Sequence, residues 1–243
     1  MKTNQTFPAI EHRSTLSPPA ATLLPVAILL WLAGAYLRIP ILVAPPLAPY
    51  IAGELALSQT LTGALTTLPI LMLAIGAMPG SLAISRIGPR NTLALALLIM
   101  TIGSAARGLA PDTTLLMAAG AVMGLGIAMM QPALPALLPR WLAPHHMAMG
   151  AAIYMNGMLM GEFIGAGITL PVIMPLAGES WRATLIAWSL PALLVAAALF
   201  LPKRDLARPT RKVAWLPDWH NPLTLRIGLL LGVSGSLFFG FNA

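Results

Sequence analysis

Long apolar runs separated by short polar breaks recur along the whole chain. The runs lie at about 22–51, 58–84, 91–109, 113–138, 147–172, 181–201 and 223–243. Each is close to the roughly 20 residues that cross a bilayer as a helix. Only helices fit, because a spanning segment must satisfy its own backbone hydrogen bonds without water, and barrel strands would alternate in polarity and be about half as long. The pattern therefore predicts an all-α transmembrane protein.

Two polar stretches divide this pattern into parts. Residues 1–21 are predicted to be a short cytoplasmic tail, since the apolar run from Ala20 is too long for the h-region of a cleaved secretory signal. Residues 202–222 are polar, basic and rich in proline, which predicts a cytoplasmic linker between two membrane units. Residues 22–201 then form a six-helix unit, and 223–243 supply a seventh helix that opens an incomplete second unit. We expect the chain to be either a short gene product or a fragment.

Composition narrows the class of protein. Of the 243 residues, 58% are hydrophobic and only 9% are charged, whereas a soluble domain carries roughly 25% charged residues. Together with a mean hydropathy of +0.82, this excludes an ordinary soluble enzyme and a disordered chain. The sequence has no cysteine, which removes disulfides, thiolate metal sites and cysteine nucleophiles.

The charges carry an orientation signal. Fourteen Lys and Arg against seven Asp and Glu give a net charge of +7. With the N-terminus inside, the external ends hold Glu54, Asp112 and Glu179, together with Arg107 and Arg182. Eleven of the 14 basic residues lie in the cytoplasmic segments: Lys2, Arg13, Arg86, Arg90, Arg140, Lys203, Arg204, Arg208, Arg211, Lys212 and Arg226.

This positive-inside pattern predicts a multi-pass protein of the inner cell membrane with a cytoplasmic N-terminus. The excess charge then also offers contacts to anionic lipids. Nucleic-acid binding is disfavoured, because the basic residues are scattered over several loops and lack a stacking platform.

The loop between the second and third runs carries a family motif. Residues 80–90 read GSLAISRIGPR, which resembles the G-x-L-A-D-R-x-G-R-R loop signature of the major facilitator superfamily. Arg86, Gly88 and Arg90 match the signature in register, and Gly80 lies one position early. Ser85 stands where the family has an acidic residue, which pairs at this turn and holds one end state of the transporter. That interaction is therefore weakened here. The resemblance assigns four residues to a cytoplasmic gating loop: Ser85, Arg86, Gly88 and Arg90.

Within the superfamily, the chain is most similar to the cyanate and nitroimidazole transporter group. The resemblance rests on five short segments: LRIP at 37–40, APPL at 44–47, GLGIA at 124–128, LP at 134–135 and WR at 181–182. It implies a six-helix N-terminal bundle plus the start of a second bundle. It also implies secondary-active transport of a cyanate-like anion or a nitroimidazole-like compound by alternating access, with no cofactor and no enzymatic chemistry.

Two other family signatures are missing. Proton-coupled members place an arginine four residues before the Gly-x-Gly pair of the fourth helix, where this chain has Gly120. The antiporter motif of the fifth helix requires Gly-Pro, whereas Gly165 is followed by Ala166. A multidrug antiporter is therefore disfavoured.

Arg38 is the strongest candidate for solute recognition. It lies in an apolar run with no other charge from Ala20 to Gly53, and an arginine at mid-membrane costs roughly 2.5–3.5 kcal/mol even on insertion scales. Its planar fork suits a small oxyanion or a cyanate-like anion. A purely structural ion pair is the alternative.

Glu162 is the expected partner of Arg38. Both residues lie about 15 residues into runs that cross in the same direction, so they share a depth, and the superfamily fold packs the first and fifth helices together. Glu162 is therefore predicted to be either an ion-pair partner or a proton-coupling site, since burial and a nearby cation shift a carboxyl group in opposite directions.

Neutral groups near this depth complete the candidate site. Gln131 and Asn156 are predicted to donate hydrogen bonds to the solute, with helix-to-helix bonding as the alternative. Gly157, Gly161 and Gly165 recur at a spacing of four, which predicts a close helix contact through small residues.

Other classes of function stay open. The chain could be a non-transporting membrane subunit, an inactive fragment or the capture subunit of an importer. Gly232-Val233-Ser234-Gly235 copies the GxSG of intramembrane serine proteases, but no histidine follows Ser234 to act as a general base. No metal site is expected. The expected partners are a small-molecule solute, the bilayer, and a second half or a second copy of the chain.

Overall fold

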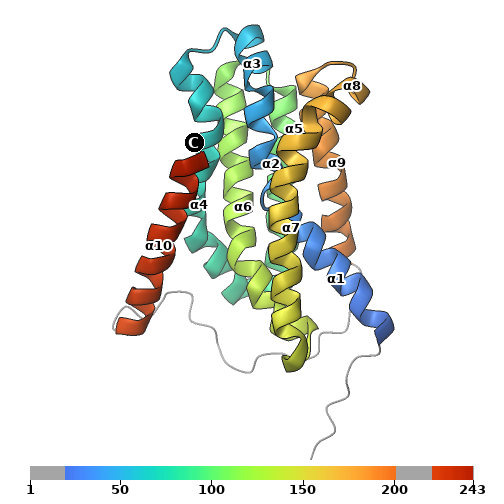
Figure 1. Cartoon of the computed structure of the whole chain (residues 1–243), viewed down its shortest axis with the longest axis vertical. Coiled ribbons are helices and arrows are strands. Elements are labelled where there is room, and N and C mark those ends of the chain that lie inside the picture. The colour runs from blue at the N-terminus through green and yellow to red at the C-terminus, as the bar shows by residue number, and fades with distance from the viewer. Residues whose placement is uncertain (1–19, 201–220, 243) are drawn as a thin grey trace, which may run out of the picture.

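The computed structural model describes residues 20–200 and 221–242, and this part of the chain is helical (Figure 1). The prediction of an all-α transmembrane protein is confirmed: six segments of the described chain are long and apolar enough to cross a membrane. Most of the predicted tail 1–21 and linker 202–222 lies outside the described residues.

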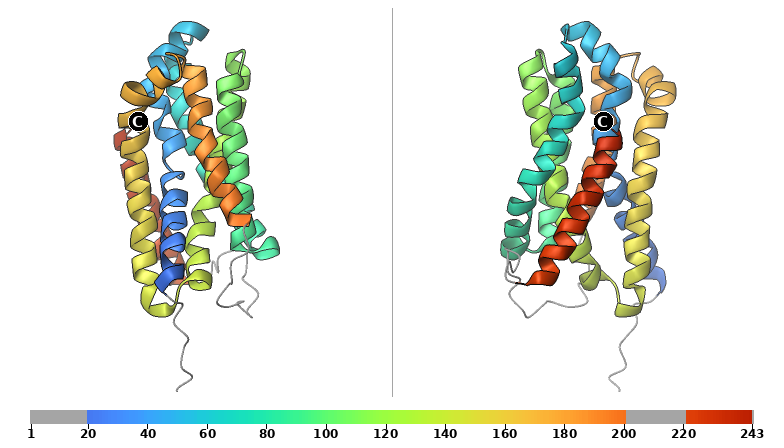
Figure 2. Two further views of the ribbon diagram at one scale, coloured as in Figure 1. Left: turned by 90° about the vertical axis from the view of Figure 1, so that its right-hand side faces the viewer. Right: turned by 60° about the vertical axis from the view of Figure 1, so that its left-hand side comes forward.

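The spans alternate in direction between two ends of one bundle (Figures 1 and 2). Turns at 87–89 and 141–147 lie at one end, and turns at 55–59, 109–113 and 176–181 lie at the other. The helices have these bounds: α1 Ala20–Ala35, α2 Ile39–Leu42, α3 Ala44–Leu55, α4 Gln59–Ile87, α5 Pro89–Leu109, α6 Thr113–Trp141, η1 Pro144–His146, α7 Met147–Ile168, the π-helical η2 Thr169–Ile173, α8 Met174–Leu176, α9 Trp181–Phe200 and α10 Pro222–Asn242.

Side-chain caps and special backbone positions set the ends of the long helices. Ser58 accepts the Leu61 amide at 3.3 Å at the start of α4, and Asp112 accepts the Leu115 amide at 2.8 Å at the start of α6. Such caps satisfy amide groups that a helix N-terminus leaves without partners. Gly88 has φ +83° and ends α4, a conformation that glycine adopts without strain.

The first span is broken where the sequence predicted a continuous helix. Residues 36–38 form a turn between α1 and α2, and Arg38 is the N-cap of α2 with φ −120° and ψ −39°. Pro40 explains the break, because proline has no N–H to bond the carbonyl four residues earlier and its ring clashes with that carbonyl. The expectation that Arg38 lies within a regular helix is therefore wrong; it lies at an interruption.

The predicted contact through small residues is confirmed between α1 and α7. A Cβ at Gly157 or Gly161 would overlap the backbone of Trp31 or Ala35, and one at Gly165 would lie 3.1 Å from the Ile39 carbonyl oxygen. The residues that face the three glycines, Trp31, Ala35 and Ile39, also recur every four positions. The two helices thus pack backbone against backbone, which leaves little freedom to slide.

The spans differ in how much of their surface the bundle buries. Over the most apolar 18 residues of each span, 61% of the stretch in α5 is buried. The buried share is only 17% in α4 and 22% in the span 144–176 that contains α7. The exposed apolar side chains include Leu71, Ile75, Met78, Leu159 and Phe163. The outer faces of α4 and α7 therefore remain for lipid or for another protein surface.

The predicted seventh helix is present as α10, at the edge of the bundle in Figure 1. Leu229 and Leu230 on it are each 70% exposed. Its membrane-spanning role stays a prediction.

The α1–α7 contact yields a test of the fold. We expect Gly161→Ala to destabilise the chain by about 1–3 kcal/mol, because a methyl group would press on the Ala35 backbone. The matched control is Gly167→Ala on the same helix, where the nearest atom lies 3.9 Å away; it should keep or raise stability. Unfolding by denaturing detergent measures both, and equal effects would contradict the close contact.

Candidate functional site

An ion pair links the break of the first span to α7. Arg38 Nε lies 3.3 Å from Glu162 Oε1, and the two side chains are 13% and 26% exposed. The predicted pairing of these residues is confirmed. A charge taken out of water is strongly destabilising unless it is paired, so each side chain compensates the other.

The glycine contact between α1 and α7 positions this pair. Glu162 directly follows Gly161, whose backbone lies against Ala35, and Arg38 lies three residues after Ala35. Because the backbones touch, the short distance between the helices brings a glutamate within reach of the arginine. The break in the first span also contributes to the position of the pair, because Arg38 extends from a turn rather than from the side of a helix.

A second arginine lies beside this break, and its burial was not predicted from the sequence. Arg107 was expected at an external end, but it is 1% exposed inside the bundle. Its Nη1 donates to the Pro40 carbonyl at 3.1 Å and lies 3.2 Å from Met123 Sδ. Its Nη2 is buried and has no hydrogen-bond partner in the part of the chain that the structure describes. The available signal was that Arg107 falls inside the apolar run 91–109, two residues from its end.

The two predicted neutral groups are not brought into contact with the ion pair. Asn156 is exposed, and its Oδ1 accepts a hydrogen bond from Trp31 Nε1 at 3.0 Å. This bond joins α1 to α7, as the helix-to-helix alternative expected. Gln131 is exposed on α6, and its side chain has no hydrogen bond within the described residues. Their role in solute binding stays a prediction.

The predicted gating loop lies at the turn between α4 and α5. Ser85 Oγ donates to its own helix, to the Leu82 carbonyl at 2.7 Å, so it does not replace the acidic residue of the family motif. Arg86 is exposed. Arg90 Nε donates to the Leu199 carbonyl at 2.8 Å, which ties α5 to α9.

Arg140 also lies at this turn, a contact that no pattern in the sequence indicated. Its guanidinium lies 3.4 Å from the position that a Cβ on Gly88 would take. Three arginines from three helices thus gather at the 87–89 end.

Sequence reasoning also missed a cluster at the opposite end. Glu54 accepts from Trp181 Nε1 at 2.5 Å and from Arg182 Nε at 3.0 Å. Arg182 also donates to the Ala110 carbonyl and lies over the Trp181 ring at 4.3 Å. We call Glu54, Trp181 and Arg182 the end staple, because it joins the first, third and sixth spans.

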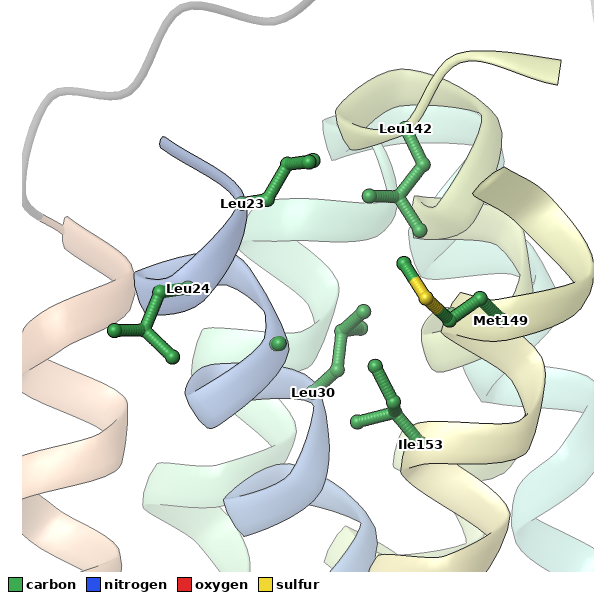
Figure 3. Close-up of a pocket in the computed structure, with 8 residues that line it drawn as sticks. Leu23, Leu24, Leu30, Leu142, Met149 and Ile153 are labelled. Carbon is green, nitrogen blue, oxygen red and sulfur yellow. The ribbon is translucent and has the colours of Figure 1, made fainter. Parts of the chain in front are cut away.

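A pocket of about 340 Å³ lies away from all these groups, between α1, α7 and the end of α6 (Figure 3). Its lining is apolar: Leu23, Leu24, Ala27, Leu30, Leu142, Met149, Gly150 and Ile153. It contains none of the predicted site residues and offers no group that selects a polar solute. Among the described residues, no cluster of three or more His, Cys, Asp or Glu could hold a metal ion.

Comparison with known proteins gives a consistent picture. The family model described as Major Facilitator Superfamily matches residues 25–243. The chain is 31% identical to the 2-nitroimidazole transporter of Escherichia coli (strain K12) over 84% of this chain and 52% of that protein. It is 30% identical to the cyanate transport protein CynX of the same organism over 67% of this chain and 41% of that protein.

Solved structures agree on the fold. A bacterial homolog of the human lysosomal transporter Spinster, in an inward-facing and unoccupied conformation, matches with a TM-score of 0.66 at 20% identity, over 85% of this chain and 47% of that chain. This chain therefore spans about half the length of the 2-nitroimidazole transporter and of the Spinster homolog.

A double-mutant cycle tests the central ion pair. We expect Arg38→Gln and Glu162→Gln each to lower the free energy of unfolding by up to about 3–5 kcal/mol, because each leaves a poorly solvated charge behind. The double variant should recover at least half of that loss. Glu179→Gln, at an exposed carboxylate, is the control and should change little. Additive losses in the double variant would show that the two groups do not interact.

Proposed function

The chain belongs to the Major Facilitator Superfamily, a family of secondary transporters and not of enzymes, and on this premise we propose that it forms one wall of a transport path for a small solute. The solute is a cyanate-like anion or a nitroimidazole-like compound, and the path opens by alternating access. Two relatives support this choice, since they carry the names 2-nitroimidazole transporter and cyanate transport protein.

The observation that carries the proposal is the guanidinium of Arg38 at the break of the first span. It is 13% exposed and forms an ion pair with Glu162 at 3.3 Å. A guanidinium donates two parallel hydrogen bonds to planar acceptors. A cyanate ion and a nitro group both present electron-rich terminal atoms, so the same fork suits both. Gln131 and Asn156 are candidates to add hydrogen bonds once a solute is present.

Glu162 is proposed to exchange a proton as well as to balance the charge of Arg38. A carboxylate that shares its cation with an anionic solute becomes less stable as an anion when that solute binds. Binding would then favour proton uptake at Glu162, which would couple solute movement to a proton. A fixed counter-ion is the alternative role.

The chain is proposed to lie in the inner membrane with the 87–89 end in the cytoplasm. Arg86, Arg90 and Arg140 gather at that end, whereas Glu54 and Asp112 lie at the other. Cytoplasmic loops carry the excess of basic residues in membrane proteins. In this orientation Ser85, Arg86, Gly88 and Arg90 form the cytoplasmic gating loop, and the N-terminus lies inside.

A complete path needs a second wall. The chain matches about half of each relative, and substrate sites in such transporters lie between two repeats. The thinly buried faces of α4 and α7 are suited to contact that second wall, supplied by another six-helix unit or a second copy. A non-transporting membrane subunit is the alternative, favoured by the same half-length match.

Uptake by arginine variants tests the recognition role. In cells expressing the full chain, Arg38→Ala should lower uptake of labelled cyanate by about 10–100-fold, the value of a lost hydrogen bond to a charged group. Uptake by Arg38→Lys should lie between that of the parent chain and that of Arg38→Ala, because lysine keeps the charge but loses the planar fork. Arg226→Ala is the control outside the six-span bundle. Uptake equal to the parent chain in both Arg38 variants would remove Arg38 from recognition.

The pH profile of uptake tests the coupling role. Glu162→Gln cannot exchange a proton, so its uptake should lose the pH dependence of the parent chain. Uptake is measured from about pH 5 to 8 and divided by the amount of protein in the membrane. A pH profile that keeps its shape in this variant would leave Glu162 as a fixed counter-ion only.

A further inference from the structure

Arg107 is a buried cation without a buried anion beside it. It is 1% exposed, and no ion pair includes it within the described residues. Its hydrogen-bond contacts are with neutral atoms, the carbonyl oxygen of Pro40 and the sulfur of Met123. Nη2 has no hydrogen-bond partner among residues 20–200 and 221–242. An arginine keeps its proton in proteins, so this position carries a full positive charge.

Such an arrangement is costly, and an ordinary structural role does not account for it. Buried charges are usually paired or moved to the interface. A neutral glutamine could also donate to the Pro40 carbonyl without bringing a charge into the bundle. The positive charge of Arg107 is therefore the feature that requires a functional explanation.

The location of Arg107 indicates that explanation. Pro40 lies two residues after Arg38, at most about 7 Å along the backbone, so Arg107 is anchored to the same break that presents Arg38. Arg38 and Glu162 cancel each other as an ion pair. Arg38, Glu162 and Arg107 together then carry a net charge of +1, which comes from Arg107.

We propose that Arg107 is a positioning residue that gives the Arg38 site its preference for monoanions over neutral solutes. It fixes the break through Pro40 and adds a positive potential at the exposed side of Arg38, without touching the solute. At an effective dielectric of about 20, one charge about 10 Å away changes the affinity for a monoanion by roughly tenfold. This inference rests on the proposed function, because it assigns the charge class of the same solute.

The test neutralises Arg107 without removing it. Met123 Sδ lies 3.2 Å from Arg107 Nη1, so Met123→Glu places a carboxylate beside the guanidinium. Met123→Gln is the matched control, with the same shape and no charge. Arg107→Gln removes the charge directly and keeps a donor for Pro40. All variants are measured as the full chain in nanodiscs, on monodisperse protein.

Binding of two probes is measured by calorimetry at millimolar concentrations. Azide serves as the linear monoanion, because it resembles cyanate but does not carbamylate lysine. The compound 1-methyl-2-nitroimidazole, which has no ionisable N–H, serves as the neutral probe. We expect Met123→Glu and Arg107→Gln to weaken azide binding about tenfold and to change neutral binding less than threefold, while Met123→Gln changes neither by more than threefold.

Several outcomes would overturn the inference. Equal weakening of both probes would show a purely structural role for Arg107, and an unchanged ratio of the two affinities would show that its charge does not reach the site. An effect of Met123→Gln as large as that of Met123→Glu would point to packing instead. If the parent chain binds neither probe, the proposed function itself fails, and the inference fails with it.

Discussion

A guanidinium away from bulk water, in the middle of an apolar bundle, is the constraint on which the site depends. Glu162 lies 3.3 Å from Arg38 and pairs with it there, and glycine faces that bring α7 onto α1 make this short distance possible. A larger residue at Gly161 would push the helices apart and weaken this ion pair. The glycine contact and the ion pair are therefore parts of one arrangement, in which backbone packing sets the electrostatics.

The broken first span extends this arrangement. Backbone polar groups at membrane depth must find their hydrogen-bond partners within the protein. Arg107 donates to the carbonyl of Pro40 from the third span. The break therefore joins Arg38 and Arg107, which come from different helices, at one irregular stretch of backbone. Irregular backbone at this depth is typical of places where a membrane protein lines a cavity or a site.

Much of this could be predicted from the sequence, and the rest has physical reasons for being hidden. Apolar length alone gives the spans, because the bilayer fixes how many residues a helix needs. Counting residues along two spans in the same direction gives a shared depth, and the family resemblance adds that the first and fifth helices pack together, which together paired Arg38 with Glu162. The break at 36–38, the burial of Arg107 and the bond from Trp31 to Asn156 depend on how distant helices rotate and tilt. Depth counting contains no information on rotation, so it could not predict that Arg107, near the end of its span, faces into the bundle.

The end staple has a mechanical meaning. Glu54 binds Trp181 and Arg182, and Arg182 reaches the carbonyl of Ala110, so three spans are fastened at the end away from Arg86. These contacts restrict splaying of the first, third and sixth spans at that end. In the proposed alternating-access cycle, these three spans would therefore tilt together, with more of the motion at the surfaces that face α4 and α7.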